Sequence, residues 1–181
     1  MKDSQTKAKE RDMIKNEELE YVFCPSILGT LLVARSGKGI CAILIGSSQK
    51  SLMKNLKERF PGAAIGKGAI DLMECAKKIA YSTDHPTSEP NLPLDIRGTD
   101  FQKRVWRALR QIPPGKTASY TEIAEKIGAP KSVRALAGAC AANPLSIVVP
   151  CHRVVRSDGA LSGYYWGVAR KRKLLQIEGA R

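Results

Sequence analysis

The sequence predicts an α/β fold in two parts, a small β-sheet with helices over residues 21–95 and a mainly helical domain over residues 96–181. Residues 21–46 read YVFCPSILGTLLVARSGKGICAILIG, a β-branched and apolar stretch broken by short turns, which favours strands. Residues 99–143 instead place apolar side chains at helical spacing between capping residues. Between the two parts, STDHPTSEPNLPLD (82–95) contains three prolines and is typical of a long loop.

The first part contains further elements in order. Residues 1–20 are charged throughout and have no apolar periodicity, so we expect a solvated tail rather than a signal peptide. SGKG at 36–39 predicts the turn of a hairpin between two strands. SLMKNLKERF (51–60) has apolar residues four apart, which form one stripe of a helix, and IDLMECAKKIAY (70–81) is a second helix candidate.

The second part contains two capping boxes, Thr99–Gln102 and Ser119–Glu122, each of which predicts a helix start. The helix after Ser119 should end at Gly128, with Pro130 in the first turn of the next helix and Asn143 at its end. Two helices joined by a tight turn that contains glycine form the helix-turn-helix pattern of DNA-binding proteins.

The second helix of that pattern is unusual, because ALAGACAA (135–142) has almost no bulky side chain. Such a helix is poor at reaching base edges but well suited to bringing its backbone close to DNA in a narrow groove. The alternative is a buried helix that packs tightly through its small residues. Arg134 at the start of the helix favours DNA contact.

The net charge of +13 is unevenly distributed, because residues 96–181 have sixteen basic and five acidic side chains. This excess indicates a polyanionic partner, DNA or RNA first, for the second part; a charged surface that serves only solubility is the alternative. The longest apolar run, ICAILI (40–45), is too short to cross a membrane. We therefore expect a soluble, cytoplasmic protein without membrane contact.

Five cysteines, an odd number, have no C-x-x-C spacing, which excludes a disulfide framework or zinc knuckle and fits a reducing compartment. We expect most of them in the core. His85 has no cysteine at metal-ligand spacing, so no metal site is predicted.

SIVV (146–149) predicts a short buried strand that delivers Cys151 and His152 to its end. Neighbouring side chains of a strand point to opposite faces, so these two cooperate only if the chain turns before the cysteine or a water bridges them. A nucleophilic thiol needs a base such as histidine, which a carboxylate usually holds; Asp158 and Glu178 are the candidates. The alternative is a buried cysteine that happens to precede a histidine.

The segments SYTEIAEKIGAPKSVRALAGACAANPLSIVVPCHRVV and RSDGALSGYYWG closely resemble the O6-alkylguanine-DNA alkyltransferases, most nearly the methyltransferase half of the bacterial Ada regulators. The resemblance is dense over 96–178 and looser back to Tyr21. It implies a ribonuclease H-like first domain and DNA repair by direct reversal. An alkyl group, mainly methyl, would pass once and irreversibly from O6 of guanine (also O4 of thymine) in duplex DNA to Cys151, after minor-groove binding and base flipping.

The resemblance also implies individual roles. Cys151 would accept the alkyl group, His152 would take the thiol proton through a water, and Glu178 would orient the histidine. Asn143 would tie the turn before the acceptor, and Tyr120 would press on the flanking phosphate and donate to the flipped guanine. The alternatives without a functional role are that Tyr120 only packs at the start of a helix and that Glu178 is only an acidic residue at the surface.

The same resemblance assigns the contacts to DNA and to the base. Arg134 would fill the space that the extruded base leaves, and further DNA contacts are expected from Thr121, Ala135, Gly138 and Ser157. The guanine would be held by the carbonyls of Cys151 and Val154, by Tyr164 and by the amide of Tyr165. Because Tyr165 and Trp166 are bulky, we expect a tight pocket that prefers methyl over large adducts.

Several alternatives remain open from the sequence. RKRK (170–173) resembles a nuclear signal, although a solvated helix face is the favoured interpretation. Nothing in the chain resembles the zinc domain of the Ada regulators, so the resemblance gives no support for a regulatory role. We predict a monomer that needs no cofactor and binds double-stranded DNA with O6-alkylguanine. The rival functions are a non-catalytic helix-turn-helix regulator and a Cys–His thiol hydrolase.

Overall fold

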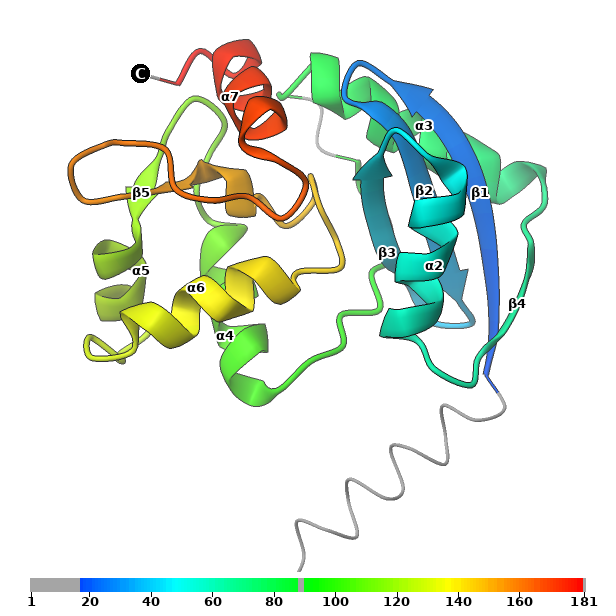
Figure 1. Cartoon of the computed structure of the whole chain (residues 1–181), viewed down its shortest axis with the longest axis horizontal. Helices are drawn as coiled ribbons and strands as arrows, with labels where there is room; N and C mark the ends of the chain where they lie inside the picture. The colour runs from blue at the N-terminus through cyan, green and yellow to red at the C-terminus, as the bar shows by residue number, and fades with distance from the viewer. Residues whose placement is uncertain (1–16, 88–89, 181) are drawn as a thin grey trace, which may run out of the picture.

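A computed structural model describes residues 17–87 and 90–180, in which a four-stranded sheet is followed by a group of short helices (Figure 1). The sheet has the order β3-β2-β1-β4. Three strands form an antiparallel meander, β1 (Glu18–Ser26), β2 (Gly29–Ser36) and β3 (Gly39–Gly46), and β4 (Ala64–Lys67) pairs parallel to β1. The predicted hairpin turn is confirmed, because Ser36 pairs with Gly39.

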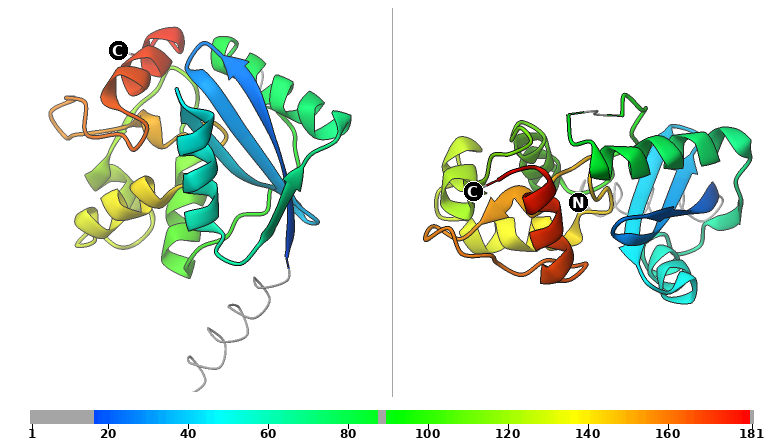
Figure 2. Two further views of the ribbon diagram at one scale, coloured as in Figure 1. Left: turned by 45° about the vertical axis from the view of Figure 1, so that its right-hand side comes forward. Right: turned by 90° about the horizontal axis from the view of Figure 1, so that it is seen from above.

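Two helices cover the sheet. The helix α2 (Gln49–Arg59) packs on β3 and β2, and α3 (Ile70–Asp84) packs on β1 and β2 from the opposite face (Figure 2). β3 is buried along nearly its whole length because both of its faces are covered, which explains why ICAILI is uniformly apolar. The predicted stripe of α2 is confirmed, since Leu52 and Leu56 are buried.

Three expectations for the first part need correction. The charged tail predicted over 1–20 extends too far along the chain, because β1 begins at Glu18 and Leu19 is 1% exposed. The part of the predicted tail before residue 17 lies outside the described residues. The loop predicted from 82 begins only after Asp84, since α3 continues to that residue. β4 was not expected, because its exposed and glycine-containing sequence has no apolar alternation.

The second part is mainly helical, and both predicted capping boxes are confirmed. Its helices are α4 (Asp100–Leu109), α5 (Tyr120–Lys126), α6 (Val133–Ala142) and α7 (Val168–Ile177). Pro130 does not lie in the first turn of α6, because residues 129–132 form a separate turn in which the Ser132 N–H donates to the Ala129 carbonyl at 2.9 Å. A short parallel pair, β5 (Ala118–Ser119) and β6 (Val154–Val155), joins the start of α5 to the segment after Cys151.

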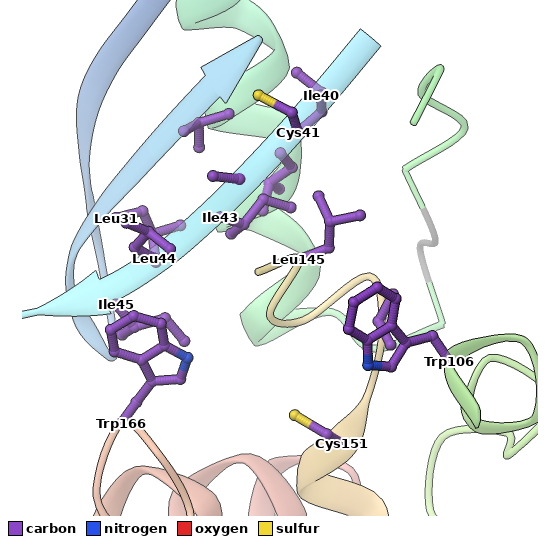
Figure 3. Close-up of a cluster of buried hydrophobic side chains, with 14 of the residues drawn as sticks. Leu31, Ile40, Cys41, Ile43, Leu44, Ile45, Trp106, Leu145, Cys151 and Trp166 are labelled. Carbon is purple, nitrogen blue, oxygen red and sulfur yellow. The ribbon is translucent and has the colours of Figure 1, made fainter. Parts of the chain in front are cut away.

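The two parts share one hydrophobic cluster that runs from the sheet to the helices. Figure 3 shows Leu145 and Trp166 reaching toward β3, with the Cys151 sulfur at the lower edge of the same cluster. Single parallel bridges connect Ile43 to Leu145 and Ile40 to Leu94. Among the described residues, no helix is long and apolar enough to cross a membrane.

Candidate active site

Cys151 is presented by a turn, and the strand predicted over 146–149 is wrong. In this segment Leu145 bridges to Ile43 of β3, after which the chain folds back: the Val149 N–H donates to the Leu145 carbonyl at 2.9 Å, and Ile147 has a positive φ of 78°. A residue in the left-handed region cannot continue a strand. Residues 151–153 then form a 3₁₀ turn, so Cys151 and His152 do not alternate as strand neighbours would.

Asn143 holds this turn together from the end of α6. Its side-chain NH₂ group donates to the Val149 carbonyl at 2.8 Å and to the Cys151 sulfur at 3.2 Å, and its side-chain oxygen accepts from the Leu145 N–H at 2.9 Å. The residue is 2% exposed, so these bonds form in a dry environment where an unpaired polar group is costly. One amide therefore fixes both the turn and the sulfur.

A second buried group begins at the residue that follows the cysteine in the chain. The Nε2 atom of His152 is 2.8 Å from a carboxylate oxygen of Glu178, and both side chains are less than 5% exposed. Arg153 donates to both oxygens of the same carboxylate and, from Nη1, to the Ile112 carbonyl at 2.5 Å. Of the two acids that the sequence offered, Glu178 contacts the histidine, whereas Asp158 lies 3.8 Å from Arg156 at the surface.

The electrostatics of these groups follow from burial. Burial lowers the pKa of His152 more than Glu178 raises it, so the imidazole is neutral at neutral pH and donates its Nε2–H to the carboxylate. Burial alone would raise the pKa of Glu178, but hydrogen bonds from His152 and Arg153 outweigh it and lower that pKa to about 2. Burial raises the pKa of the Cys151 thiol, against the opposing hydrogen bond from Asn143, so the thiol is protonated at rest.

Cys151 opens onto a cavity of about 430 Å³. One wall is α6, and the other is the segment around Gly163; the lining residues are Tyr120, Ala137, Cys140, Ala141, Cys151, Ser162, Gly163, Tyr164 and Tyr165. The Tyr164 hydroxyl and the His152 Nδ1 atom are buried and have no hydrogen-bond partner among the described residues. Both are therefore available to a bound molecule or a water.

A chain of hydrogen bonds leads from the cavity to a buried lysine. The Tyr120 hydroxyl is 2.8 Å from the Ser162 hydroxyl, which accepts from Lys171 Nζ at 2.7 Å. Lys171 also donates to the Val154 carbonyl at 2.5 Å and is fully buried. Burial lowers the pKa of this ammonium. The Val154 carbonyl, which the resemblance predicts to hold the flipped guanine, thus already accepts a hydrogen bond from Lys171.

Trp166 does not line the cavity. Its indole is 9% exposed, is directed toward Ile45 of β3 (Figure 3), and donates to the Ser146 hydroxyl at 2.5 Å. Tyr165 does line the cavity and is 52% exposed. Of the two bulky residues that were expected to narrow the pocket, Tyr165 lines it and Trp166 does not.

The residues expected at DNA are all exposed at the surface. Arg134, Ala135 and Gly138 are exposed on α6, on the side opposite to the buried Leu136 and Ala139. Thr121 at the start of α5 is exposed and its hydroxyl is 3.4 Å from that of Ser157. The small residues of α6 therefore fit both tight packing against the core and close approach of DNA. The helix packs on one side and is exposed on the other.

Three site residues were missed from the sequence: Arg153, Ser162 and Lys171. Arg153 directly follows Cys151–His152, but no pattern says that an arginine beside a histidine is buried. RKRK (170–173) was interpreted as a solvated face, yet Lys171 is buried, and Arg170 and Lys173 donate to the Leu28 and Ile27 carbonyls. The apolar residues of α7 were the available signal, because Lys171 lies three and four residues before the buried Leu174 and Leu175 and therefore on the same face of the helix.

Comparison with known proteins defines the class. Residues 100–180 match the family model described as 6-O-methylguanine DNA methyltransferase, DNA binding domain. The chain is 50% identical over 121 residues to the methylated-DNA–protein-cysteine methyltransferase of Mycobacterium tuberculosis H37Rv, which covers 67% of this chain and 68% of that protein. It is 38% identical over 149 residues to the inducible enzyme of that name from Bacillus subtilis, covering 81% and 82%. The chain belongs to the methylated-DNA–protein-cysteine methyltransferase family.

Longer relatives and solved structures agree with this assignment. The chain is 48% identical over 164 residues to the bifunctional transcriptional activator and DNA repair enzyme Ada of Escherichia coli K12, covering 91% of this chain and 46% of Ada, so it spans about half the length of that relative. The crystal structure of M. tuberculosis O6-methylguanine methyltransferase superposes with a TM-score of 0.69 at 36% identity, covering 89% and 93% of the two chains. The crystal structure of M. tuberculosis OGT in complex with DNA also superposes with a TM-score of 0.69, at 34% identity, covering 90% of this chain and 92% of that chain.

Proposed function

We propose that this protein repairs DNA by direct reversal and that Cys151 accepts the alkyl group, mainly methyl, from O6 of guanine or O4 of thymine. The observation that carries the proposal is a buried thiol, bonded by Asn143 and adjoining a His152–Glu178 pair, at a cavity beside an exposed small-residue helix in a chain of this family. A sulfur–carbon bond forms as the oxygen–carbon bond breaks. The thioether product is not reversed, so each molecule acts once, and the bond exchange needs no cofactor.

The proton balance uses the groups around the sulfur. The thiol proton passes through a water to His152 Nδ1, which has no partner among the described residues, and Glu178 balances the imidazolium. The departing guanine takes one proton from the Tyr120 hydroxyl at the cavity wall, and the proton held by the histidine restores the phenol through solvent. Overall, one proton moves from sulfur to guanine.

DNA engagement would use α5 and α6 as a helix-turn-helix. Guanine O6 is hidden inside the stack, so the base must leave the duplex, at a cost of a few kcal/mol. The exposed, small-residue side of α6 permits close approach in the minor groove, and Arg134 would fill the vacated space. Thr121, Ala135, Gly138 and Ser157 surround this face. The basic excess of residues 96–181 would supply affinity for any sequence.

The flipped base would lie in the cavity beside Cys151. The Tyr164 hydroxyl is the buried donor without a partner among the described residues, and the Tyr165 amide belongs to the same wall. A carbonyl oxygen has two lone pairs, so that of Cys151, which accepts from the Val154 N–H, can also accept from the guanine. The Val154 carbonyl already accepts from Lys171 and from the Ser162 hydroxyl, so the guanine would replace the longer bond from Ser162. We further propose a ribonuclease H-like domain over 21–95, a DNA-binding domain over 96–181, and a monomer that works on double-stranded DNA in the cytoplasm.

Mass spectrometry of the protein after mixing with DNA that contains O6-methylguanine tests the proposal. We expect one methyl mass per chain, on the peptide with Cys151, without further turnover. Cys151→Ser should remain unmodified, whereas Cys140→Ser, which removes the other thiol at the same cavity, should react. An unmodified wild-type protein, or methyl on another residue, would contradict the proposal.

The same experiment separates the rival functions. A helix-turn-helix regulator needs no thiol, so it would bind DNA without gaining mass. A thiol hydrolase would turn over repeatedly and leave an unmodified cysteine. Only an alkyl acceptor is consumed in a ratio of one to one.

A further inference from the structure

One helix of the first part contacts both walls of the cavity. From α2, the side-chain NH₂ group of Asn55 donates to the Tyr165 hydroxyl at 2.6 Å. Arg59 donates from Nη1 to the Ala142 carbonyl at the end of α6 at 3.0 Å, and its guanidinium lies 5.1 Å from the centre of the Tyr165 ring. Tyr165 and the end of α6 are therefore linked through α2.

The local sequence makes this arrangement rigid. Asn55 and Arg59 are four residues apart and so lie on one face of α2, where the Arg59 Nε–H donates to the Asn55 side-chain oxygen at 2.8 Å. That bond orients the guanidinium toward the last carbonyls of α6, which form the negative end of its dipole. The buried residues Leu52 and Leu56 anchor α2 on the sheet. The two polar side chains therefore project from a fixed support.

The Tyr165 side chain has few other contacts, whereas the backbone beside it is held by a bond from Arg170 to the Trp166 carbonyl. Tyr165 is 52% exposed, and the bond from Asn55 is the one its hydroxyl makes among the described residues. Gly163 and Gly167 flank it, and Gly167 has a φ of 97°, in a region that favours glycine. On its other side Tyr165 packs edge-on against Trp166, with ring centres 4.7 Å apart. The ring position at the cavity thus depends on Asn55 and Arg59.

We propose that Asn55 and Arg59 are positioning residues that hold Tyr165 at the cavity and thereby limit the size of the alkyl group that Cys151 accepts. This inference rests on the proposed function. With the contacts in place, the distance between Tyr165 and the α6 wall is fixed and a methyl group fits. Without them, the Tyr165 side chain moves outward and a benzyl group gains access.

A role in stability alone would give a different result. The contacts lie at the partly exposed edge of the molecule, where one hydrogen bond or one cation–π contact contributes about 1 kcal/mol. Their loss leaves the buried face of α2 and the His152–Glu178 pair intact. Removing them should therefore change selectivity far more than the folding midpoint.

The test compares transfer rates to Cys151 from one duplex that contains O6-methylguanine and from the same duplex with O6-benzylguanine. Arg59→Ala should raise the benzyl-to-methyl rate ratio by about tenfold, and Asn55→Ala should raise it in the same direction. Lys57→Ala, an exposed residue of the same helix, removes an equal charge and should leave the ratio unchanged. Because both rates use one DNA sequence, a change in DNA affinity cancels in the ratio.

Hydrogen exchange of residues 163–167 gives a second measurement, with faster exchange expected in Arg59→Ala than in Lys57→Ala. Arg59→Lys keeps the positive charge but loses the planar guanidinium. Its benzyl-to-methyl rate ratio should therefore lie between those of wild type and Arg59→Ala. Wild-type protein that accepts no methyl group would overturn the proposed function. Wild-type protein that accepts methyl, with a ratio in Arg59→Ala and Asn55→Ala within twofold of Lys57→Ala, would overturn the size limit alone.

Discussion

Glu178→Gln tests the buried network behind the acceptor. The wild-type carboxylate has a pKa of about 2, against 4.5 for an unperturbed carboxyl, because His152 and Arg153 both donate to it. At roughly 1.4 kcal/mol per pKa unit, this gap corresponds to about 3 kcal/mol of stability at neutral pH. The amide retains the shape but leaves the buried guanidinium without its anion, so we expect Glu178→Gln to lower the free energy of unfolding at pH 7 by about 3 kcal/mol.

The sign of the pH dependence follows from the lowered pKa. The carboxylate contributes in full above pH 4.5, and this stability is lost as the pH falls through the folded-state pKa of about 2. The difference between wild type and Glu178→Gln should therefore narrow below pH 4.5. Urea unfolding followed by the fluorescence of the buried Trp106 and Trp166 measures it, with Glu125→Gln on exposed α5 as the control. A cost below about 1 kcal/mol at pH 7, or an equal cost at pH 7 and pH 3, would refute the reasoning.

Three further predictions concern the acceptor and the DNA face. Asn143→Ala should lower the free energy of unfolding by about 2–4 kcal/mol, because it leaves the buried Leu145 N–H unpaired and removes one of the two hydrogen bonds to the Val149 carbonyl; a urea midpoint equal to that of wild type would contradict this. The transfer rate should be flat from about pH 6.5 to 8.5, since the lowered pKa of His152 keeps its base form available while the raised pKa of Cys151 keeps the thiol protonated. A tenfold rise per pH unit in a rate profile would instead show reaction through preformed thiolate. Arg134→Ala should weaken DNA binding and reduce the salt slope by about 1 while leaving transfer from free O6-methylguanine base unchanged; equal loss on the free base would place Arg134 in the chemistry.

Local signals predicted much of the fold. The capping boxes at Thr99 and Ser119 specify helix starts through side-chain hydrogen bonds that need no distant partner, and both formed as expected. The stripe of α2 was visible because burial against one sheet imposes a period of 3.6. Elements that depend on distant partners were not visible: β4 is a strand only because β1 lies beside it.

The site shows the same division. The Cys151–His152 step and the basic second part could be seen in the sequence, and the residues needed for a thiol and its base were named from it. The turn at 146–149 could not be predicted, because its apolar residues are those of a strand and the turn depends on the Asn143 side chain, which bonds to the Leu145 N–H and the Val149 carbonyl. The burial of Arg153 and Lys171 depends on how α7 packs, which charge patterns in the sequence do not reveal.

The 7% exposure of Cys151 has a consequence for the lifetime of the protein before it meets damage. Under the proposed function each molecule acts once, so oxidation of its Cys151 sulfur by peroxide would remove one repair event. Oxidants react with exposed thiolate, and here the thiol is protonated, buried and bonded by Asn143. Burial would therefore keep the thiol reduced until the protein meets damage, and the number of lesions that a cell can reverse at once would equal the number of molecules whose Cys151 is still reduced.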